Sequence, residues 1–365
     1  MISEKIAKHL VIGADKLISQ ASNVVILTHL SPDGDAMGSS LGFKHWLIRQ
    51  GKKVNVVVPN VFPDFLHWMP GAADDLVYEN SKLQADELME QADLIICTDF
   101  NEPKRIGTLG DKLMNLLESR PTLSRQSVLL VDHHLFPADF ADVTISYPDS
   151  PSASELVYRL ISQISVLRQQ PFSLDLDTAT CLYTGMMTDT GNFSFNSNYP
   201  EMYEIVGNLV GIGVNKDAVY NAVFNSYKAD RMRLMGFCLY QKMRIFPEYH
   251  TALIFLSRKE LYRFNFQSGD AEGIVNLPLQ IKDVYYSCFM REDKVYPSEV
   301  SQAGGSNIKV KISMRSQGDR PVNTFCHDIF NGGGHMNASG GEYYGPIAEA
   351  VKLFVDNYAN FFRQD

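Results

Sequence analysis

Residues 23–38 read NVVILTHLSPDGDAMG and combine the two patterns from which the fold is predicted. The apolar run NVVIL is typical of a buried strand, and the polar loop after it leads into a helical pattern that continues to Gly51. Similar apolar runs recur in KVNVVVPN, DLIICTDF and SVLLVDHH, and a further helical pattern spans 82–91. Because these runs lack polar alternation, we predict an α/β domain whose parallel sheet is buried on both faces and flanked by helices.

The second half of the chain predicts helices first and a smaller domain after them. Ser152 is placed to cap the helix of SASELVYRLISQIS, and LDTATCLYTGMMTDTGNF continues the helical pattern. Strands are predicted in TALIFLS, VYYSCFM and NIKVKISMRS, followed by the glycine cluster NGGGHMNASGG and a closing helix. We therefore expect a first domain over 1–200, a helical connector over 201–240 and a smaller mixed α/β domain over 241–365.

Composition and charge argue against several classes of protein. The net charge of -9 disfavours a protein that coats long nucleic acid through a broad basic surface. The 5 cysteines are widely spaced and form no C-x-x-C pair, which predicts reduced, buried thiols. The segment MISEKIAKHLVIGADKLISQ predicts an amphipathic helix and not a signal peptide, and no apolar run reaches the roughly 18–20 residues that span a bilayer. We expect a cytoplasmic protein without a membrane partner.

Polar side chains gather where the predicted strands end. Such positions lie at one edge of an open parallel sheet, where ligands bind. One Asp at a strand end is more often a helix cap, and one His is more often a hydrogen-bonded core or surface residue. However, several carboxylates gathered at the ends of neighbouring strands would repel one another unless cations neutralised them. The candidate metal ligands are His29, Asp33, Asp35, Asp99, His133 and Asp189.

The ligand types narrow the choice of metal. Imidazole and carboxylates without cysteine favour manganese, with magnesium, cobalt or iron as alternatives. Six ligands exceed the need of one ion, so we expect two ions about 3.5–4 Å apart that share a carboxylate. A water between two such ions would be a hydroxide suited to attack on phosphorus.

These motifs resemble those of the DHH phosphoesterase superfamily, which includes RecJ-type exonucleases, manganese-dependent pyrophosphatases and nanoRNases that also act as phosphoadenosine phosphate phosphatases. The resemblance covers nearly the whole chain and implies two ion sites that share Asp99. It implies that His134 contacts the scissile phosphate or the leaving oxygen, and that Asp132 orients the histidine pair. The implied ligand sets are His29, Asp33 and Asp99 for one ion, and Asp35, Asp99, His133 and Asp189 for the other.

Substrate-binding candidates lie mainly in the C-terminal part. Consecutive glycines let backbone N–H groups approach an anion, although such a run is also compatible with a plain flexible loop. Arg315 ends a predicted strand and could hold a phosphate through two hydrogen bonds or lie in a solvated turn, and Arg105 could reach the site or pair with Glu102. The cluster also resembles the DHH-associated domain, with Asn331 where relatives usually have a glycine. The candidates are Arg315, Gly333, Gly334, His335, Ser339 and Arg105.

The resemblance also indicates a branch of the superfamily. Pyrophosphatases lack the glycine–histidine cluster, RecJ-type enzymes are larger, and the membrane-bound cyclic dinucleotide phosphodiesterases carry transmembrane segments. We therefore expect an enzyme that hydrolyses short oligoribonucleotides, linear dinucleotides or 3'-phosphoadenosine 5'-phosphate, without long nucleic acid as a partner. A RecJ-like single-strand exonuclease, a catalytically silent nucleotide-binding regulator and a scaffold with a stabilising cation are the alternatives. The resemblance is also compatible with a homodimer.

Overall fold

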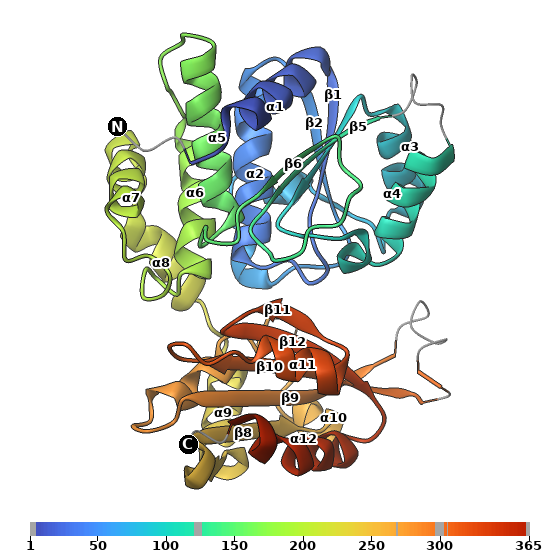
Figure 1. Cartoon of the computed structure of the whole chain (residues 1–365), viewed down its shortest axis with the longest axis vertical. Coiled ribbons are helices and arrows are strands. Elements are labelled where there is room, and N and C mark those ends of the chain that lie inside the picture. Colours follow the sequence, from blue (N-terminus) through green and yellow to red (C-terminus); the bar gives the residue numbers. More distant parts are fainter. Residues whose placement is uncertain (1–4, 120–125, 268, 296–302, 305, 363–365) are drawn as a thin grey trace. The chain divides into compact units, whose positions relative to one another are not determined.

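The computed structural model describes residues 5–119, 126–267, 269–295, 303–304 and 306–362. The chain divides into two compact units, which comprise residues 1–226 and 227–365 (Figure 1). Each unit has its own sheet and its own buried apolar core.

The first unit is built on a parallel sheet of 6 strands in the order β3-β2-β1-β4-β5-β6, which confirms the predicted α/β fold. All neighbouring strands are parallel, and the central ones are almost completely buried because helices cover both faces. The short strands β3 and β6 at the two edges were not predicted. The strands are β1 (Asn23–Leu27), β2 (Lys53–Val58), β3 (Leu76–Val77), β4 (Leu94–Thr98), β5 (Ser127–Asp132) and β6 (Val143–Ser146).

Helices pack against both faces of this sheet (Figure 1). Side chains that alternate along β1 enter different cores, since Val24 lies in one apolar cluster and Val25 in the other. The larger core receives α1 (Lys8–Gln20), α2 (Gly34–Arg49), α5 (Ala153–Leu167) and α6 (Leu176–Asp189), and the smaller core receives α3 (Lys82–Gln91) and α4 (Thr108–Ser119). Ser152 caps α5 as predicted, because its side chain accepts a hydrogen bond from the Glu155 N–H.

Helices α2 and α6 approach so closely that only glycine fits at their contact. A Cβ atom on Gly38 of α2 would lie 2.7 Å from the Cys181 carbonyl oxygen and 2.7 Å from Cα of Gly185, both on α6. Gly34 and Gly42 lie one turn to either side of Gly38, and Cβ atoms there would lie 2.3 Å from the Thr188 side chain and 2.6 Å from the Leu182 side chain. The backbones of α2 and α6 are therefore in direct contact at Gly38.

Substitution of Gly38 by alanine tests this contact. We expect Gly38→Ala to lower the free energy of unfolding by about 1–3 kcal/mol, because the added methyl group must push the two backbones apart. Gly207→Ala is the matched control, since Gly207 lies in α7 (Pro200–Ile212) with nothing within 4 Å of an added Cβ. That control should raise the stability by about 0.5–1 kcal/mol through its helix propensity. Urea unfolding measures both changes, and equal stability of the two variants would contradict the close contact.

The segment 201–240, which we expected to connect the domains, is divided between the two units. Helices α7 (Pro200–Ile212) and α8 (Lys216–Phe224) belong to the first unit, because their apolar residues Met202, Ile205 and Val219 are buried in its larger core. Helix α9 (Ala229–Phe237) belongs to the second unit, where Leu234 is buried. The boundary between the units falls between Ser226 and Tyr227.

The second unit contains a mixed sheet of 6 strands in the order β11-β12-β10-β9-β8-β7. Strands β8 and β9 are parallel, and the other neighbours are antiparallel. One apolar core lies under α11 (Asn323–Phe330) and α12 (Ile347–Phe362), and another lies under α9, α10 (Arg258–Arg263) and η6 (Ile274–Gln280). The strands are β7 (Arg244–Phe246), β8 (Thr251–Leu256), β9 (Tyr286–Lys294), β10 (Ile308–Ser316), β11 (Gly333–His335) and β12 (Ala338–Tyr344).

The glycine cluster contains a paired β-structure, which argues against the plain flexible loop that was the alternative interpretation. Gly333 and Gly334 belong to β11, which pairs with β12, and a Cβ atom on Gly334 would lie 2.6 Å from the Ala338 carbonyl oxygen. Asn331 ends α11 in the left-handed conformation, with φ of 48°. Asparagine tolerates that conformation better than most residues, so it is well suited to end this helix.

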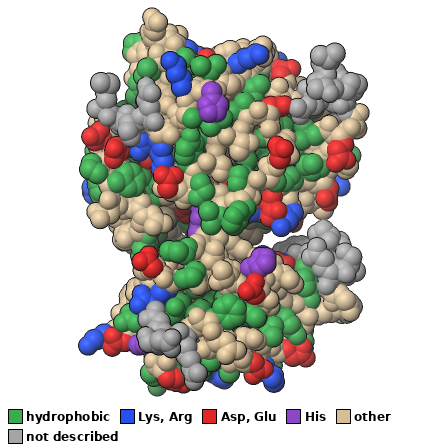
Figure 2. Space-filling view, in the orientation of Figure 1, with side chains coloured by type: hydrophobic (Ala, Val, Ile, Leu, Met, Phe, Trp, Pro, Cys, Tyr) green, Lys and Arg blue, Asp and Glu red, His purple; other side chains and the backbone are tan. Residues whose placement is uncertain are grey.

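Two predictions from composition can be compared with the structure. All the cysteines, Cys97, Cys181, Cys238, Cys288 and Cys326, are buried free thiols, as predicted. Within the described part of the chain, every helix falls short of the length and apolarity needed to cross a membrane. On the face drawn in Figure 2, acidic and basic side chains are interspersed over both units.

Candidate metal centre

The carboxyl ends of β1, β4 and β5 carry three of the predicted metal ligands. These strands are neighbours in the sheet, so His29, Asp99 and His133 follow adjacent strands at the same edge. Nδ1 of His29 lies 2.9 Å from the Leu30 carbonyl oxygen, and Nδ1 of His133 lies 3.1 Å from the Ser150 carbonyl oxygen. A carbonyl only accepts, so each Nδ1 carries a proton, and Nε2 is the nitrogen with which each ring would bind a cation.

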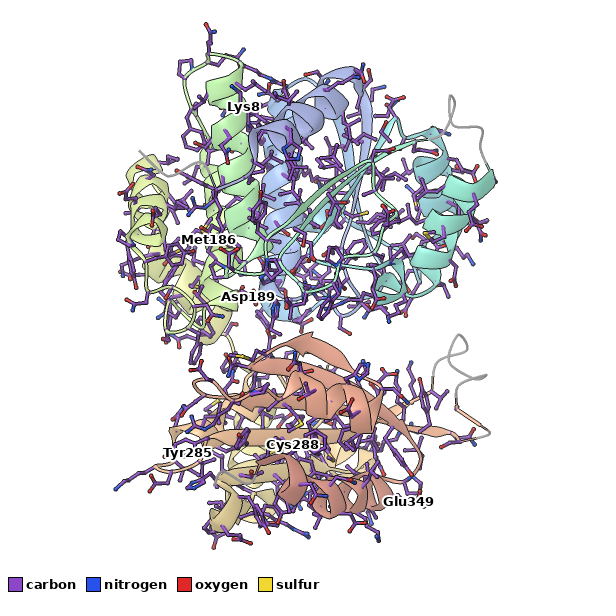
Figure 3. The ribbon with its side chains drawn as sticks, viewed as in Figure 1. Lys8, Met186, Asp189, Tyr285, Cys288 and Glu349 are labelled. Atoms are coloured by element: carbon purple, nitrogen blue, oxygen red, sulfur yellow. The ribbon has the colours of Figure 1, made fainter. Side chains whose placement is uncertain are left out.

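The remaining predicted ligands come from helix ends. Asp33 caps α2, and its Oδ1 accepts hydrogen bonds of 3.0 Å from the Asp35 and Ala36 N–H groups. Asp35 lies in the first turn of the same helix and is 1% exposed. Asp189 is the last residue of α6, one turn beyond Met186, and its side chain remains 31% exposed (Figure 3). The close contact between α2 and α6 therefore also positions carboxylates from both helices.

The structure brings all six predicted ligands together as two groups joined by Asp99. Within each group, one ligand atom from every residue lies within 4.8 Å of the others. Oδ2 of Asp99 lies 3.4 Å from Nε2 of His29, and Oδ1 of Asp99 lies 3.2 Å from Nε2 of His133. The first group is His29, Asp33 and Asp99, and the second is Asp35, His133 and Asp189.

The electrostatics of these groups fit divalent cations. Burial and the charges of Asp99 and Asp189 raise the pKa of Asp35 well above its usual range. Among the residues that the structure describes, none donates a hydrogen bond of regular geometry to the buried Oδ1 of Asp99, although Nε2 of His133 lies 3.2 Å away. Asp99 also adopts the left-handed conformation, with φ of 64°, a kind of backbone strain that is common at functional sites. Imidazole nitrogens with carboxylate oxygens suit manganese or magnesium.

Without a cation, protons must compensate the carboxylate charge. Burial alone would lower the pKa of His29, but hydrogen bonds and charge from Asp33 and Asp99 raise it to about 10. In the metal-free protein this imidazolium contributes stability that is complete below the usual pKa of 6.5 and is lost as the pH rises through about 10. A metal ion that binds Nε2 of His29 must displace this proton.

We therefore expect Mn2+ binding to release protons and to strengthen with pH. For a site that loses one proton, the affinity should rise about tenfold per pH unit between roughly pH 6.5 and 8.5. Calorimetric titration at pH 7.5 in two buffers of different ionisation enthalpy measures the number of protons released. Heats that do not depend on the buffer would contradict a protonated histidine ligand.

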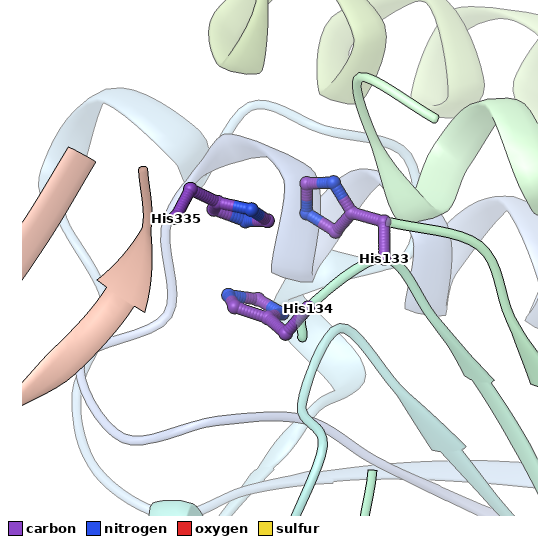
Figure 4. Close-up of side chains that lie close together, drawn as sticks. All are labelled: His133, His134 and His335. Carbon is purple, nitrogen blue, oxygen red and sulfur yellow. The ribbon is translucent and has the colours of Figure 1, made fainter. Parts of the chain in front are cut away.

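His134 lies beside His133 but has a different partner. Nδ1 of His134 lies 2.8 Å from Oδ1 of Asp132, and the His134 backbone N–H donates to Oδ2 of Asp132 at 3.0 Å. The two imidazole rings meet edge to face at 68°, with centroids 4.9 Å apart (Figure 4). Asp132 thus orients His134, whereas the Ser150 carbonyl orients His133. This differs from the expectation that Asp132 orients both histidines.

Arg105 lies in η3 (Pro103–Ile106), close to His134. Burial and the positive charge of Arg105 lower the pKa of His134, despite the opposing effect of Asp132. Glu102, the alternative partner considered for Arg105, forms an ion pair of 2.8 Å with Lys104. The Arg105 backbone carbonyl accepts a hydrogen bond of 2.9 Å from the Leu30 N–H, which ties η3 to the loop after β1.

The substrate-binding candidates of the second unit lie close together at one end of its sheet. Arg315 of β10 and His335 of β11 both stand opposite Ala338 of β12, so they form one row across three strands. Gly334 pairs with Ser339 in the next row, and Ser339 Oγ donates to the Gly333 carbonyl at 2.7 Å. Ser339 therefore has a structural role in holding β11. A role in substrate binding stays a prediction for these residues.

Residues that hold the ligands in place were missed by sequence reasoning. The backbone N–H groups of Ala153 and Ser154 donate to the Asp35 carboxylate, and Glu155 is completely buried beside Ser150. The available signal in the sequence was Glu155, an acidic residue within the apolar pattern of α5. From the sequence alone, however, such a residue is equally well explained by helix capping or by exposure to solvent.

Comparison with known proteins gives three findings. A model of the "DHH family, N-terminal domain" matches residues 23–186. The chain is 22% identical over 341 residues to the bifunctional oligoribonuclease and PAP phosphatase NrnA of Bacillus subtilis (strain 168), covering 93% of this chain and 95% of that protein. It is 44% identical to an exopolyphosphatase-related protein from Bacteroides fragilis, whose crystal structure superposes with a TM-score of 0.85 over 98% of both chains.

A further solved structure shares the fold at low sequence identity. RecJ from Thermus thermophilus, determined in complex with Mn2+, superposes with a TM-score of 0.57 and is 13% identical. The match covers 100% of this chain and 56% of that one, so RecJ contains a large additional part. This likeness concerns the fold alone.

Proposed function

The chain belongs to the DHH family of metal-dependent phosphoesterases, and from this premise we propose that it uses two divalent ions to hydrolyse short oligoribonucleotides or 3'-phosphoadenosine 5'-phosphate. The position of Asp99 is the observation that carries the proposal, because its two oxygens lie 3.4 and 3.2 Å from histidines of separate ligand groups. A carboxylate shared between two ions is the usual arrangement of a two-metal hydrolase.

His29, Asp33 and Asp99 would hold one ion, and Asp35, His133, Asp189 and Asp99 the other. Two such ions activate water and neutralise the charge that develops on the phosphoryl group. The protein keeps the imidazoles in the tautomer that leaves Nε2 available, through the Leu30 and Ser150 carbonyls. Burial of Asp35 and Asp99 strengthens their electrostatic interaction with cations.

His134 would contact the phosphate or the leaving oxygen. Its Nδ1 is engaged with Asp132, so a contact with the substrate would have to be made through Nε2. To donate from Nε2 while Nδ1 also donates, the ring must be an imidazolium. Burial and Arg105 disfavour that form, whereas Asp132 and a bound phosphate favour it. His134 would therefore take up a proton when an anionic substrate binds and return it to the leaving oxygen.

The preference for short substrates is supported by the curated relative and by the second unit. The Bacillus subtilis protein matches over nearly its full length and is named as an oligoribonuclease and PAP phosphatase. In this chain, Arg315 and His335 share one row of the second sheet, where a guanidinium and an imidazole could bind a terminal phosphate. Manganese is the proposed metal, and short RNA or a nucleotide is the proposed partner.

A hydrolysis panel with Mn2+ tests the proposal. The substrates are pApA, a five-nucleotide RNA, 3'-phosphoadenosine 5'-phosphate, long single-stranded DNA, pyrophosphate and polyphosphate. We expect turnover of one or more of the first three, loss of turnover on chelation, and recovery on addition of Mn2+. Preferential cleavage of long DNA would instead support a RecJ-like exonuclease, and preferential cleavage of polyphosphate or pyrophosphate would overturn the nucleotide substrate. Metal binding without turnover of any substrate would support a regulator or scaffold.

A further inference from the structure

The first turn of α5 holds one of the two ligand groups. Oδ2 of Asp35 accepts a hydrogen bond of 2.6 Å from the Ala153 N–H, and Oδ1 accepts one of 3.0 Å from the Ser154 N–H. These N–H groups have no partner within the helix, and the positive end of the helix dipole favours a carboxylate beside them. Asp35 therefore has a fixed position before any metal binds.

The next residue of that turn, Glu155, reaches a second ligand of the same group. Oε2 of Glu155 accepts a hydrogen bond of 2.6 Å from Ser150 Oγ, and the Ser150 carbonyl accepts from Nδ1 of His133. Glu155 is completely buried, and its charge is balanced by Arg159, whose Nε lies 2.6 Å from Oε1. The Tyr199 hydroxyl donates to Oε2 at 2.9 Å. A buried carboxylate with three donors is a rigid support.

The other ligand group is held by different parts of the chain. His29 is oriented by the Leu30 carbonyl, and Asp33 is held by the N–H groups of its own helix. None of these contacts involves α5. The two groups thus share Asp99 and the first turn of α2, whereas the contacts from α5 and Ser150 reach only Asp35 and His133.

We propose that Glu155 is a positioning residue that tunes the affinity of the ion held by Asp35, His133 and Asp189, independently of the ion held by His29 and Asp33. This inference rests on the two-ion site of the proposed function. Ser150 transmits the effect, because its side chain is fixed by Glu155 while its carbonyl fixes the imidazole of His133. Residues that orient metal ligands commonly change metal affinity by about 10–100-fold.

The test uses full-length variants that remove single hydrogen bonds of this support. Ser150→Ala removes the hydroxyl that contacts Glu155 but keeps the carbonyl that holds His133. Tyr199→Phe removes a different donor to the Glu155 carboxylate, and it replaces Ser150→Ala in the test if that variant folds poorly. Tyr158→Phe is the matched control, because Tyr158 is a buried residue of α5 whose hydroxyl accepts a hydrogen bond from Asn208 at 3.2 Å, away from Ser150.

Binding of Mn2+ is followed by the electron paramagnetic resonance signal of the free ion, independently of activity. We expect two ions per wild-type chain, and a roughly 10–100-fold loss of affinity for one of them in Ser150→Ala, with a smaller loss for the same ion in Tyr199→Phe. Tyr158→Phe should match the wild type. Equal weakening of both ions, unchanged affinities, or a single ion in the wild type would each overturn the inference. If the wild type binds two ions but hydrolyses no substrate of the panel, the proposed substrates fail and the positioning role remains measurable by this titration.

Discussion

The variant Asp99→Asn is expected to lose hydrolysis almost completely, with kcat/KM reduced about 10⁴-fold or more. This corresponds to on the order of 5 kcal/mol of lost transition-state stabilisation. Asp99 contacts histidines of both ligand groups, so an amide there weakens both ion sites at once. Asparagine also tolerates the left-handed backbone of this position, where φ is 64°, so the fold should be kept.

The control for this variant is Asp149→Asn, which removes a carboxylate that is 77% exposed and pairs with Lys5 on the surface of the same unit. An exposed pair contributes little to stability, so activity and thermal stability should stay close to those of the wild type. The stabilisation by Mn2+ in a thermal unfolding experiment should be strong in this control and weak in Asp99→Asn. Turnover within about tenfold of the wild type in Asp99→Asn would rule out a shared carboxylate.

The variant His134→Asn is expected to lower kcat about 10²–10³-fold while both ions still bind. An asparagine can keep a hydrogen bond to Asp132, but it lacks the ring atom Nε2 that would contact the substrate. Single-turnover kinetics and Mn2+ titration separate the two effects. His9 lies on the exposed face of α1, so His9→Asn is the control. It should leave both kcat and the binding of Mn2+ unchanged.

A competing role of His134 is also tested by this variant. His134, Asp132 and Asp99 lie close enough together to hold an ion themselves. Loss of one bound ion in His134→Asn would show that His134 is a metal ligand and would contradict its proposed contact with the phosphate. The variants of Asp99 and His134 therefore separate the binding of the metal ions from the proposed contact of His134 with the phosphate or the leaving oxygen.

The sequence predicted the parts of the fold that have strong local patterns. Strands β1, β2, β4 and β5 are apolar runs, and each is followed by a polar loop, so their order along the chain and the positions of His29, Asp99 and His133 could be predicted. The edge strands β3 and β6 are too short to carry such a pattern and are only partly buried. Strand β11 was missed because glycine disfavours strands; the close approach of β12 explains Gly334, whereas a Cβ atom on Gly333 would meet nothing within 4 Å.

The connections between the metal ligands and their supports could not be predicted. Asp35 and Ala153 are separated by 118 residues, and their hydrogen bond depends on how α2 and α5 pack together. Ser150 contributes a backbone carbonyl, and every residue type has one, so its contact with His133 leaves no trace in the sequence. Candidate ligands can be identified by type and spacing, whereas the groups that orient them are defined by the tertiary structure.

The glycine contact between α2 and α6 also determines how the site responds to heat and pressure. Asp35 lies in the first turn of α2 and Asp189 ends α6, and between them the two backbones touch at Gly38 and Gly185. Directly touching backbones leave no side chain that could change its rotamer and no void that could be compressed. The spacing of these two carboxylates should therefore be among the last distances in the first unit to change as its loops loosen.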